Sequence, residues 1–213
     1  MIKRDARFWE SLYKEQDVES MPWYMPGMDC DLEKAVKKRR WKHGKALDLG
    51  TGPGTQAMAL AARGFEVVGT DISRSAIRKA KMKVRGKKIA VDFRYDDILK
   101  TKLKGPFDLI FDRGCFHTLS PRQRARYIRN VYDLLKEGGF LFLKCFSHKE
   151  PFDDGPYRFK PQEIKKLFGG MFEKVSLHRS VFEGVRRPHP LALFCEIRKA
   201  GGALCSCWRS SSK

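Results

Sequence analysis

The feature that most limits the fold of this chain is a glycine-rich turn between two short apolar segments. The apolar run Lys45–Leu49 is followed at once by Gly50–Gly54, which reads Gly-Thr-Gly-Pro-Gly. Good helix formers occupy Thr55–Arg63, and a β-branched run, Phe65–Thr70, leads into Asp71. This order predicts a strand, a turn, a helix and a second parallel strand, which is the start of an α/β sheet.

The same stretch carries groups that suit a nucleoside. Glycines let the backbone approach a ligand closely, and free N–H groups at the amino end of a helix can donate hydrogen bonds to it. A carboxylate after the second strand, here Asp71, can accept hydrogen bonds from two ribose hydroxyls. A glycine-rich loop alone could be a plain structural turn, but the accompanying strand, helix and acid favour a ligand that contains a ribose.

The spacing of the glycines separates two kinds of nucleoside ligand. The dinucleotide fingerprint is G-x-G-x-x-G, whereas here the third glycine comes one position earlier and Asp48 precedes the first. The stretch resembles the D-x-G-x-G-x-G motif of class I S-adenosylmethionine-dependent methyltransferases. That resemblance implies S-adenosyl-L-methionine as the cofactor and S-adenosyl-L-homocysteine as its product. The cofactor contacts that it implies here are Asp48, Gly50, Thr51, Gly52, Gly54, Asp71 and Ile72.

Two further strand ends extend the resemblance. After a third predicted strand, Asp97 and Ile98 match the family's third acidic position, where a carboxylate and the next backbone N–H hold the adenine. A capping or turn role for Asp97 is the alternative. A fourth predicted strand ends at Asp112, which the resemblance places beside the cofactor.

The segment Arg113–Leu119 follows this fourth strand and faces the expected position of the methyl group. With the helix opened by proline and the paired glycines that come next, it looks like the corresponding region of thiopurine S-methyltransferases and tellurite-resistance methyltransferases, which share an Asp-Arg-Gly turn. Arg113 and His117 are the candidate catalytic residues, because positive charge would stabilise a thiolate acceptor. Arg113 could instead be scaffolding paired with Asp112 or Asp48, and His117 could be a satisfied polar residue.

The amino-terminal residues 1–43 are predicted to form a helical cover over the site. Helical periodicity marks residues 4–16 and 31–41, and a loop rich in proline and aromatic residues, 21–27, separates them. The candidate substrate contacts are Trp9, Trp23, Tyr24, Arg113 and, in the polar loop 147–160, Arg158. Simple packing of the aromatic residues onto the core is an equal alternative.

The rest of the pattern completes a Rossmann-like α/β fold. Strands are expected at 45–49, 65–70, 87–94, 106–112, 140–146, 172–182 and 190–197, and core helices at 55–63, 73–85, 121–136 and 161–168. The last two strands should form a hairpin, which gives the antiparallel seventh strand of this methyltransferase fold. We expect a single domain, 1–199, in which the core 44–199 carries helices on both faces of a seven-stranded, mostly parallel sheet. A flexible tail, 200–213, is expected to follow.

Composition constrains the partners of the protein only loosely. The formal net charge of +19 suits nucleic acid or another anion, although runs of charge are usually solvated helix faces. There is no apolar run of membrane-spanning length, no secretory signal pattern and no C-x-x-C pair. Cys205 and Cys207 alone are a poor metal site. We expect a cytoplasmic monomer or homodimer with no metal and no membrane association.

Together these features predict a methyltransferase that moves a methyl group from S-adenosylmethionine directly to a small-molecule nucleophile. A thiol or another soft nucleophile is the preferred acceptor. The alternative is an RNA or protein methyltransferase that uses the basic surface, so nucleic acid is a possible but less favoured partner. A cofactor-binding protein without catalysis and a nicotinamide oxidoreductase form the third class.

Overall fold

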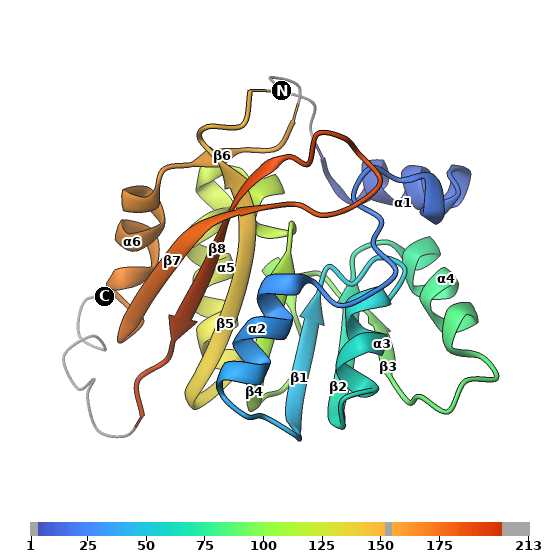
Figure 1. The fold of residues 1–213 in the computed structure, drawn as a ribbon, viewed down its shortest axis with the longest axis horizontal. Coiled ribbons are helices and arrows are strands. Elements are labelled where there is room, and N and C mark those ends of the chain that lie inside the picture. The colour runs from blue at the N-terminus through green and yellow to red at the C-terminus, as the bar shows by residue number, and fades with distance from the viewer. Residues whose placement is uncertain (1–3, 152–154, 202–213) are drawn as a thin grey trace.

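A twisted sheet runs through the centre of the computed structural model, which describes residues 4–151 and 155–201 (Figure 1). Its strands are β1 (Gly44–Leu49), β2 (Phe65–Asp71), β3 (Asp92–Tyr95), β4 (Phe107–Arg113), β5 (Leu135–Ser147), β6 (Arg158–Phe159), β7 (Lys174–Val181) and β8 (Leu191–Arg198). The order across the sheet is β3-β2-β1-β4-β5-β8-β7, and β6 pairs with β5. The direction of winding reverses between β1 and β4, and ligands bind at the carboxyl ends of the strands at such a point.

The predicted Rossmann-like sheet with an antiparallel last strand is confirmed. Strands β1 to β5 pair in parallel, β8 runs antiparallel to β5, and β7 and β8 form the predicted hairpin. The prediction of seven strands missed β6. This strand has only two residues, which pair with Phe146 and Ser147, and two residues are too few for an alternating pattern.

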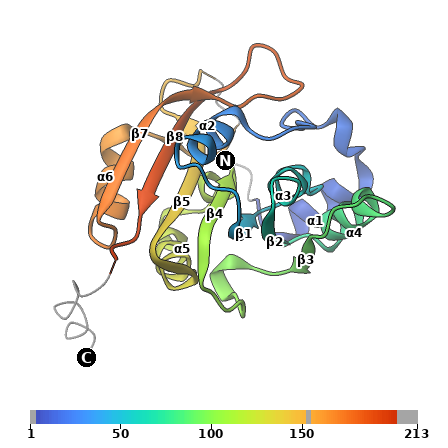
Figure 2. The same cartoon turned by 60° about the horizontal axis from the view of Figure 1, so that its bottom comes forward.

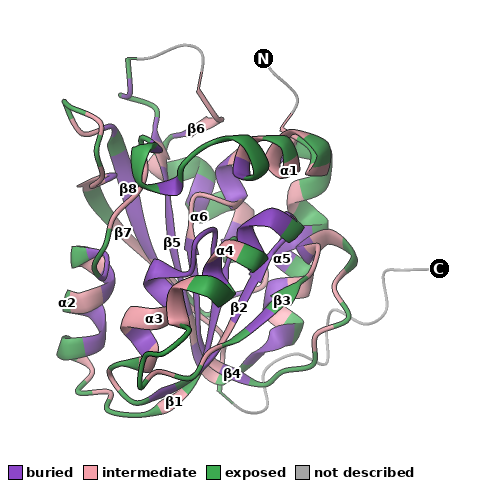
Figure 3. Ribbon diagram, turned by 90° about the vertical axis from the view of Figure 1, so that its right-hand side faces the viewer, coloured by how far each residue is buried: buried purple, intermediate pink, exposed green. Residues whose placement is uncertain are grey.

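The helices form a layer on each face of the sheet. They are α1 (Ala6–Glu15), α2 (Cys30–Lys38), α3 (Thr55–Ala61), α4 (Arg74–Val84), α5 (Pro121–Leu134) and α6 (Pro161–Gly169), with 3₁₀ turns η1 (Val18–Ser20), η2 (Ile98–Lys100) and η3 (Phe116–Thr118). Apolar residues of α2, α3 and α4 pack on one face, and those of α5 and α6 pack on the other. Figure 3 shows the result: the central strands are mostly buried, and exposed residues lie on the outer sides of the helices and on the edge strands β3 and β7.

Two boundaries differ from the prediction for a physical reason. Strand β3 begins at Asp92, because the basic turn before it stays exposed. Strand β5 begins at Leu135, directly after α5, and its register against β4 shifts between Phe107 and Leu109. The paired Gly138 and Gly139, expected to end the helix, therefore lie inside β5.

Helix α1 is held against α4, and Figure 2 shows the two helices side by side. The carboxylate of Glu10 accepts hydrogen bonds from Ser73 Oγ (2.8 Å), Ser75 N–H (3.0 Å) and Ser75 Oγ (2.7 Å) at the amino end of α4. Burial opposes the charge, but these hydrogen bonds lower the pKa of Glu10 to about 2. Glu10 thus attaches helix α1 of the cover to helix α4 of the core.

The predicted tail is almost entirely outside the described residues. Of 200–213, the structure describes Ala200 and Gly201, and Cys205 and Cys207 lie beyond them. Cys30, Cys115, Cys145 and Cys195, which are described, have free thiols. No helix among the described residues combines the length and the apolar character that crossing a membrane requires.

Gly54 fits closely between the glycine turn and the sheet. It precedes α3 with a φ of +80°, in the left-handed region. A Cβ there would lie 2.6 Å from Phe93 Cζ and 3.1 Å from Ala80 Cβ. A side chain at this position would therefore be strained and overpacked at once.

We expect Gly54→Ala to lower the free energy of unfolding by about 2–4 kcal/mol, from left-handed strain and overpacking together. Urea unfolding measures it. Gly170→Ala is the matched control, because Gly170 has a φ of −76° and nothing within 4 Å of a Cβ. The control should change stability by less than about 0.5 kcal/mol. Equal stability of the two variants would contradict the close packing of Gly54 against Phe93 and Ala80.

Candidate active site

Three aspartates meet where the sheet reverses its winding. Asp48 in β1, Asp71 at the end of β2 and Asp112 in β4 are 2%, 7% and 0% exposed. Their strands are neighbours in the sheet, so their carboxylates gather at one edge. Buried carboxylates are rare without hydrogen-bond donors, and the partners of each one indicate what it does.

Asp48 fastens the glycine turn to the first turn of α3. Its Oδ2 accepts hydrogen bonds from Thr51 Oγ1 at 2.5 Å and from Ala57 N–H at 3.0 Å. Burial raises the pKa of Asp48 to about 7, although both hydrogen bonds oppose the shift. The negative charges of Asp71 and Asp112 act in the same direction as burial.

Asp71 joins the glycine turn to the amino end of α4. Its Oδ2 accepts from Gly52 N–H at 2.9 Å, and its Oδ1 accepts from Ser73 N–H at 2.8 Å. Burial raises the pKa of Asp71 to about 6. The residue predicted to hold a ribose thus lies directly beside the turn predicted to hold the rest of the cofactor.

Asp112 has a different set of partners. Its oxygens accept from the N–H groups of Gly114, Cys115 and Phe116 and from the hydroxyl of Tyr127 at 2.5 Å. Burial raises the pKa of Asp112 to about 6. The carboxylate fixes the loop after β4, and a contact between Asp112 and the cofactor stays a prediction.

A small cavity lies between the cover and the glycine turn. It brings together three predicted cofactor residues and three predicted substrate residues, and its lining is Val18, Trp23, Tyr24, Met25, Asp48, Gly50, Thr51, Pro53, Thr55, Gln56 and Arg113. Trp9 packs behind it, with its ring centroid 6.0 Å from that of Trp23. The predicted residues outside this lining are Gly52, Gly54, Asp71, Ile72, Asp97, Ile98, Asp112, His117 and Arg158.

Two of these outlying positions have other contacts. Asp97 caps η2, with Oδ1 accepting from Leu99 N–H at 2.9 Å, which is the capping role left open by the sequence. Arg158 lies in β6, beside the end of β5. Adenine binding by Asp97 and substrate binding by Arg158 stay predictions.

Tyr13 is a site residue that the sequence did not single out. It is 5% exposed, and a Cβ on Gly52 would lie 2.6 Å from its hydroxyl. Burial raises the pKa of Tyr13, and the charges of Asp71 and Asp48 raise it further. The sequence did hold a signal for Tyr13. It follows Trp9, a predicted substrate contact, by four residues, so the two side chains lie on the same side of α1.

The chemistry of this corner fits a nucleoside cofactor. Gly52 has a φ of +52° and no side chain, so its backbone is open to close approach, and in this structure the Tyr13 hydroxyl occupies the space beside it. Asp71 supplies a carboxylate beside it, and the amino end of α3 follows. The cavity measures about 40 Å³, which is room for a few water molecules at about 10–15 Å³ each.

Arg113 ties three segments together. Its Nε donates to Asp29 Oδ2 at 3.0 Å, one terminal nitrogen donates to Trp23 O at 3.1 Å, and the other donates to Glu183 O. The scaffolding role considered from the sequence is therefore present, but the ion-pair partner is Asp29 and not Asp112 or Asp48. A contact between Arg113 and substrate stays a prediction.

Asp29 is fully buried and holds a second cation. Lys144 Nζ lies 2.8 and 2.6 Å from the two oxygens of Asp29 and 2.8 Å from Asp31 Oδ2. Asp29 also caps α2, and its own N–H donates to Gln56 Oε1 at 2.8 Å. The signal in the sequence was Lys144 itself, because a lysine inside an apolar strand requires a carboxylate partner.

His117 is buried among aromatic rings. Its Nδ1 accepts from Phe146 N–H at 3.2 Å, which assigns the proton of the neutral ring to Nε2. Its ring centroid lies 4.6 Å from Phe146 and 5.4 Å from Phe182. Burial lowers the pKa of His117 to about 3, and the charges of Arg4 and Arg113 add to this effect.

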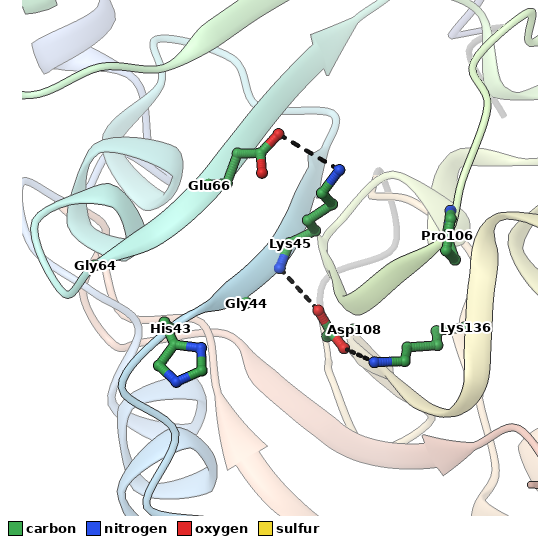
Figure 4. Close-up of a pocket in the computed structure, with 8 residues that line it drawn as sticks. All are labelled: His43, Gly44, Lys45, Gly64, Glu66, Pro106, Asp108 and Lys136. Atoms are coloured by element: carbon green, nitrogen blue, oxygen red, sulfur yellow. Dashed lines mark hydrogen bonds and ion pairs between the residues drawn. The ribbon is translucent and has the colours of Figure 1, made fainter.

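A larger cavity, of about 430 Å³, opens at the other edge of the sheet (Figure 4). Its charged groups neutralise one another: Asp108 accepts from Lys45 N–H at 2.9 Å and from Lys136 Nζ at 3.1 Å, and Lys45 Nζ lies 3.7 Å from Glu66. This cavity lies at the amino ends of β1 and β4. Because open α/β sheets bind ligands at the carboxyl ends, we assign the site to the smaller cavity.

Several known proteins are similar to this chain. Residues 46–139 match the family model described as a methyltransferase domain, which covers the glycine turn and the loop after β4. An uncharacterized methyltransferase of Schizosaccharomyces pombe, C750.03c, is 36% identical over 106 residues, which are 49% of this chain and 73% of that protein.

Two further proteins match over more of the chain. A probable thiol methyltransferase 2 of Arabidopsis thaliana is 28% identical over 180 residues, covering 83% of this chain and 78% of its own. A solved SAM-dependent methyltransferase of Methanosarcina mazei has a TM-score of 0.65 at 18% identity, covering 79% of this chain and 98% of its own. The second likeness concerns the fold alone.

We expect Asp29→Asn to lower the free energy of unfolding by about 3–5 kcal/mol, because Lys144 and Arg113 would keep their charges without the buried carboxylate. Urea unfolding measures this loss. Glu196→Gln is the control: it breaks the ion pair with Arg39 (2.5 Å), whose side chains are 19% and 17% exposed, and should cost only about 1 kcal/mol. A smaller loss for Asp29→Asn than for the control would contradict the central position of Asp29.

Proposed function

The chain belongs to the S-adenosylmethionine-dependent methyltransferases, and we propose that it methylates a small acceptor that is already an anion, such as a thiolate. The observation that carries the proposal is the protonation state of His117. With Nδ1 accepting from Phe146 and the proton on Nε2, the ring can donate a hydrogen bond at Nε2 but has no free nitrogen to take a proton. Its pKa of about 3 keeps it neutral at physiological pH.

An acceptor next to such a ring has to lose its proton by itself. A thiol is partly ionised near neutral pH, whereas an alcohol or an ammonium group is not reactive without a base. The aromatic surroundings support the same choice. The rings of Phe146 and Phe182 pack together, with their centroids 5.1 Å apart, and a polarizable sulfur makes favourable contacts with aromatic rings. The similarity to a probable thiol methyltransferase of Arabidopsis thaliana agrees with this acceptor class.

In the proposed reaction the bound cofactor supplies an electrophilic methyl group, and the protein aligns the acceptor with it. Asp71 accepts from the ribose hydroxyls, and the backbone of Gly52 and the loop fixed by Asp48 line the remainder of the cofactor. The three aspartates place negative charge near a cationic ligand. His117 lies outside the lining of the small cavity, and in the proposed complex its Nε2–H would donate to the anionic acceptor while Phe182 beside it would exclude water.

The cover has to move for this cofactor to enter. A cavity of about 40 Å³ has room for only a few water molecules, Trp23 lines it, and the Tyr13 hydroxyl occupies the space over the neighbouring Gly52. We propose that the segment from α1 to Trp23 swings aside and returns over the bound cofactor. The contacts of Arg113 with Trp23 O and Glu183 O then hold the closed position.

The test is transfer of a radiolabelled methyl group from S-adenosylmethionine to a series of thiols with different pKa values, to alcohols and amines, and separately to RNA and protein extract. We expect label on the thiols, with kcat/KM rising with pH through the pKa of each thiol, because the thiolate is the reactive form. Label confined to RNA or protein would overturn the proposal and favour a macromolecular acceptor.

His117→Asn should lower kcat/KM for thiols about 10- to 100-fold through loss of one hydrogen bond to a charged group. The dependence on the pKa of the thiol should remain. His43→Asn is the control, since His43 is exposed at the opposite edge of the sheet. Loss of the pH dependence in His117→Asn would instead identify His117 as a base.

We expect cofactor binding to release protons near pH 6.5. The pKa values of Asp48 and Asp71, about 7 and about 6, leave these carboxyls partly protonated there, and a cationic cofactor favours their charged forms. Affinity should therefore rise as the pH is raised from about 5 to about 8. Calorimetry in buffers of different ionisation enthalpy counts the protons released.

Two comparisons sharpen this measurement. S-adenosylhomocysteine lacks the sulfonium charge and should release fewer protons than the methylated cofactor. Asp48→Asn should lower the number released, whereas Asp108→Asn should not, because hydrogen bonds from Lys45 and Lys136 overcome its burial and keep the pKa of Asp108 below its usual value. Equal proton release by the two variants would show that Asp48 does not lose a proton when the cofactor binds, which contradicts the prediction.

A further inference from the structure

Helix α4 and the turn after it carry an unusual concentration of positive charge. From residue 73 to residue 91 the chain has eight lysines and arginines and no aspartate or glutamate. Six of the eight are exposed, and we call them the basic ridge: Arg74, Arg78, Lys81, Arg85, Lys87 and Lys88. In Figure 1 this helix lies at the outer edge of the molecule, far from β7 and β8.

The first four residues of the basic ridge form one line. Positions 74, 78, 81 and 85 are separated by four, three and four residues, so they share a face of the helix. At 1.5 Å per residue the line is about 17 Å long. In a base-stacked helix the phosphates of one strand are spaced about 3.4 Å apart along the axis, so about five of them span such a length.

Ion pairs within the protein do little to stabilise the basic ridge. Its Arg78 lies 3.7 Å from Glu10. No carboxylate of residues 4–151 or 155–201 forms an ion pair with Arg74, Lys81, Arg85, Lys87 or Lys88. Like charges three or four residues apart destabilise a helix by a few tenths of a kcal/mol per pair. On α2, by contrast, Lys37 pairs with Glu33. The ridge is therefore a cost to folding that an external anion would remove.

The inner side of the same helix is different. Lys79 Nζ donates to Gln16 O at 2.6 Å, and Lys83 Nζ lies 2.9 Å from Glu19 and 3.2 Å from Tyr24 Oη. These two lysines hold the cover, whereas the ridge residues are exposed, and of them Arg78 also reaches the cover, through Glu10. The separation of tasks on one short helix indicates that the outer charges are available to a partner.

The neighbouring side chains favour nucleic acid over a lipid surface. Tyr95 is 46% exposed, and the guanidinium of Arg74 lies 4.1 Å from its ring centroid. Exposed aromatic rings and arginine planes are the platforms on which unpaired bases stack. The apolar side of α4, with Ile77 and Ala80, is buried in the core, so it cannot enter a bilayer as an interfacial helix does.

We propose that the basic ridge and Tyr95 form a docking surface for single-stranded nucleic acid, with phosphates along α4 and a base on Tyr95. This surface lies outside the candidate active site and does not depend on the acceptor proposed above. Docking there would bring the enzyme to a polynucleotide without making that polynucleotide its methyl acceptor.

The test is fluorescence anisotropy of a labelled uridine-rich RNA of about 15 nucleotides, titrated with the protein at several salt concentrations. About five phosphate contacts predict a slope of log K against log salt of about −3.5. The triple variant Arg74→Gln/Lys81→Gln/Arg85→Gln should reduce that slope by about 2 and weaken binding by about tenfold or more at low salt. Tyr95→Ala should weaken binding about 5- to 150-fold with an unchanged slope.

The matched control removes three arginines from the other face of the sheet. Arg122, Arg126 and Arg129 are exposed in one line on α5, so Arg122→Gln/Arg126→Gln/Arg129→Gln changes the net charge equally. Its RNA affinity should stay within about twofold. An equal loss in both triple variants, or no binding at low salt, would overturn the proposal.

Two further measurements separate the remaining outcomes. Binding of anionic phospholipid vesicles that depends on the ridge, with no RNA binding, would overturn the proposal in favour of a membrane surface. The variant Arg74→Lys/Lys81→Arg/Arg85→Lys keeps every charge and should keep the salt slope, which shows that a loss in the glutamine variant is electrostatic. Methyl transfer to a small thiol should be unchanged in the glutamine variant, so failure of the docking proposal and failure of the acceptor proposal are told apart.

Discussion

The closed arrangement of this enzyme depends on one buried carboxylate. Asp29 balances Lys144 from the sheet and Arg113 from the loop after β4, and it caps the helix of the cover. Each cation would be costly to bury without a carboxylate, and Asp31, 2.8 Å from Lys144, shares with Asp29 the neutralisation of that lysine. Because Arg113 also reaches Trp23 and Glu183, the ion cluster fixes the cover and the β7–β8 loop in the same position.

The carboxylates at the strand ends differ from Asp29, because no cation among the described residues is paired with them. Asp48, Asp71 and Asp112 are buried close together, and burial raises the pKa of each, to about 7, 6 and 6. Gathering negative charge in this way costs stability as the pH rises from about 4 up to those values, because over that range the carboxyls ionise in the unfolded chain before they do in the folded one. A positively charged ligand offsets that cost, so the site is shaped electrostatically for a cation before it binds one.

The sequence predicted the sheet, the antiparallel end and the glycine turn because these depend on local patterns. Alternation, glycine spacing and the acid after the second strand are all visible over a few residues. The role of Arg113 could not be predicted in the same way, because its partners Asp29 and Glu183 are 84 and 70 positions away. Tyr13 over Gly52 and the tautomer of His117 likewise depend on how separate segments meet. Lys144 was not singled out from the sequence either, although a charge inside an apolar strand is a local signal that a buried partner is present.

Helix α4 contacts the cover on one side and carries the basic ridge on the other. Its inner lysines hold the cover, its amino end receives Glu10 of α1, and its outer face carries the basic ridge. A rigid element with ligands on two sides transmits free energy in both directions, and thermodynamic linkage makes the two effects equal. An anion that steadies α4 would therefore favour the closed cover by the same factor as cover closure would favour the anion.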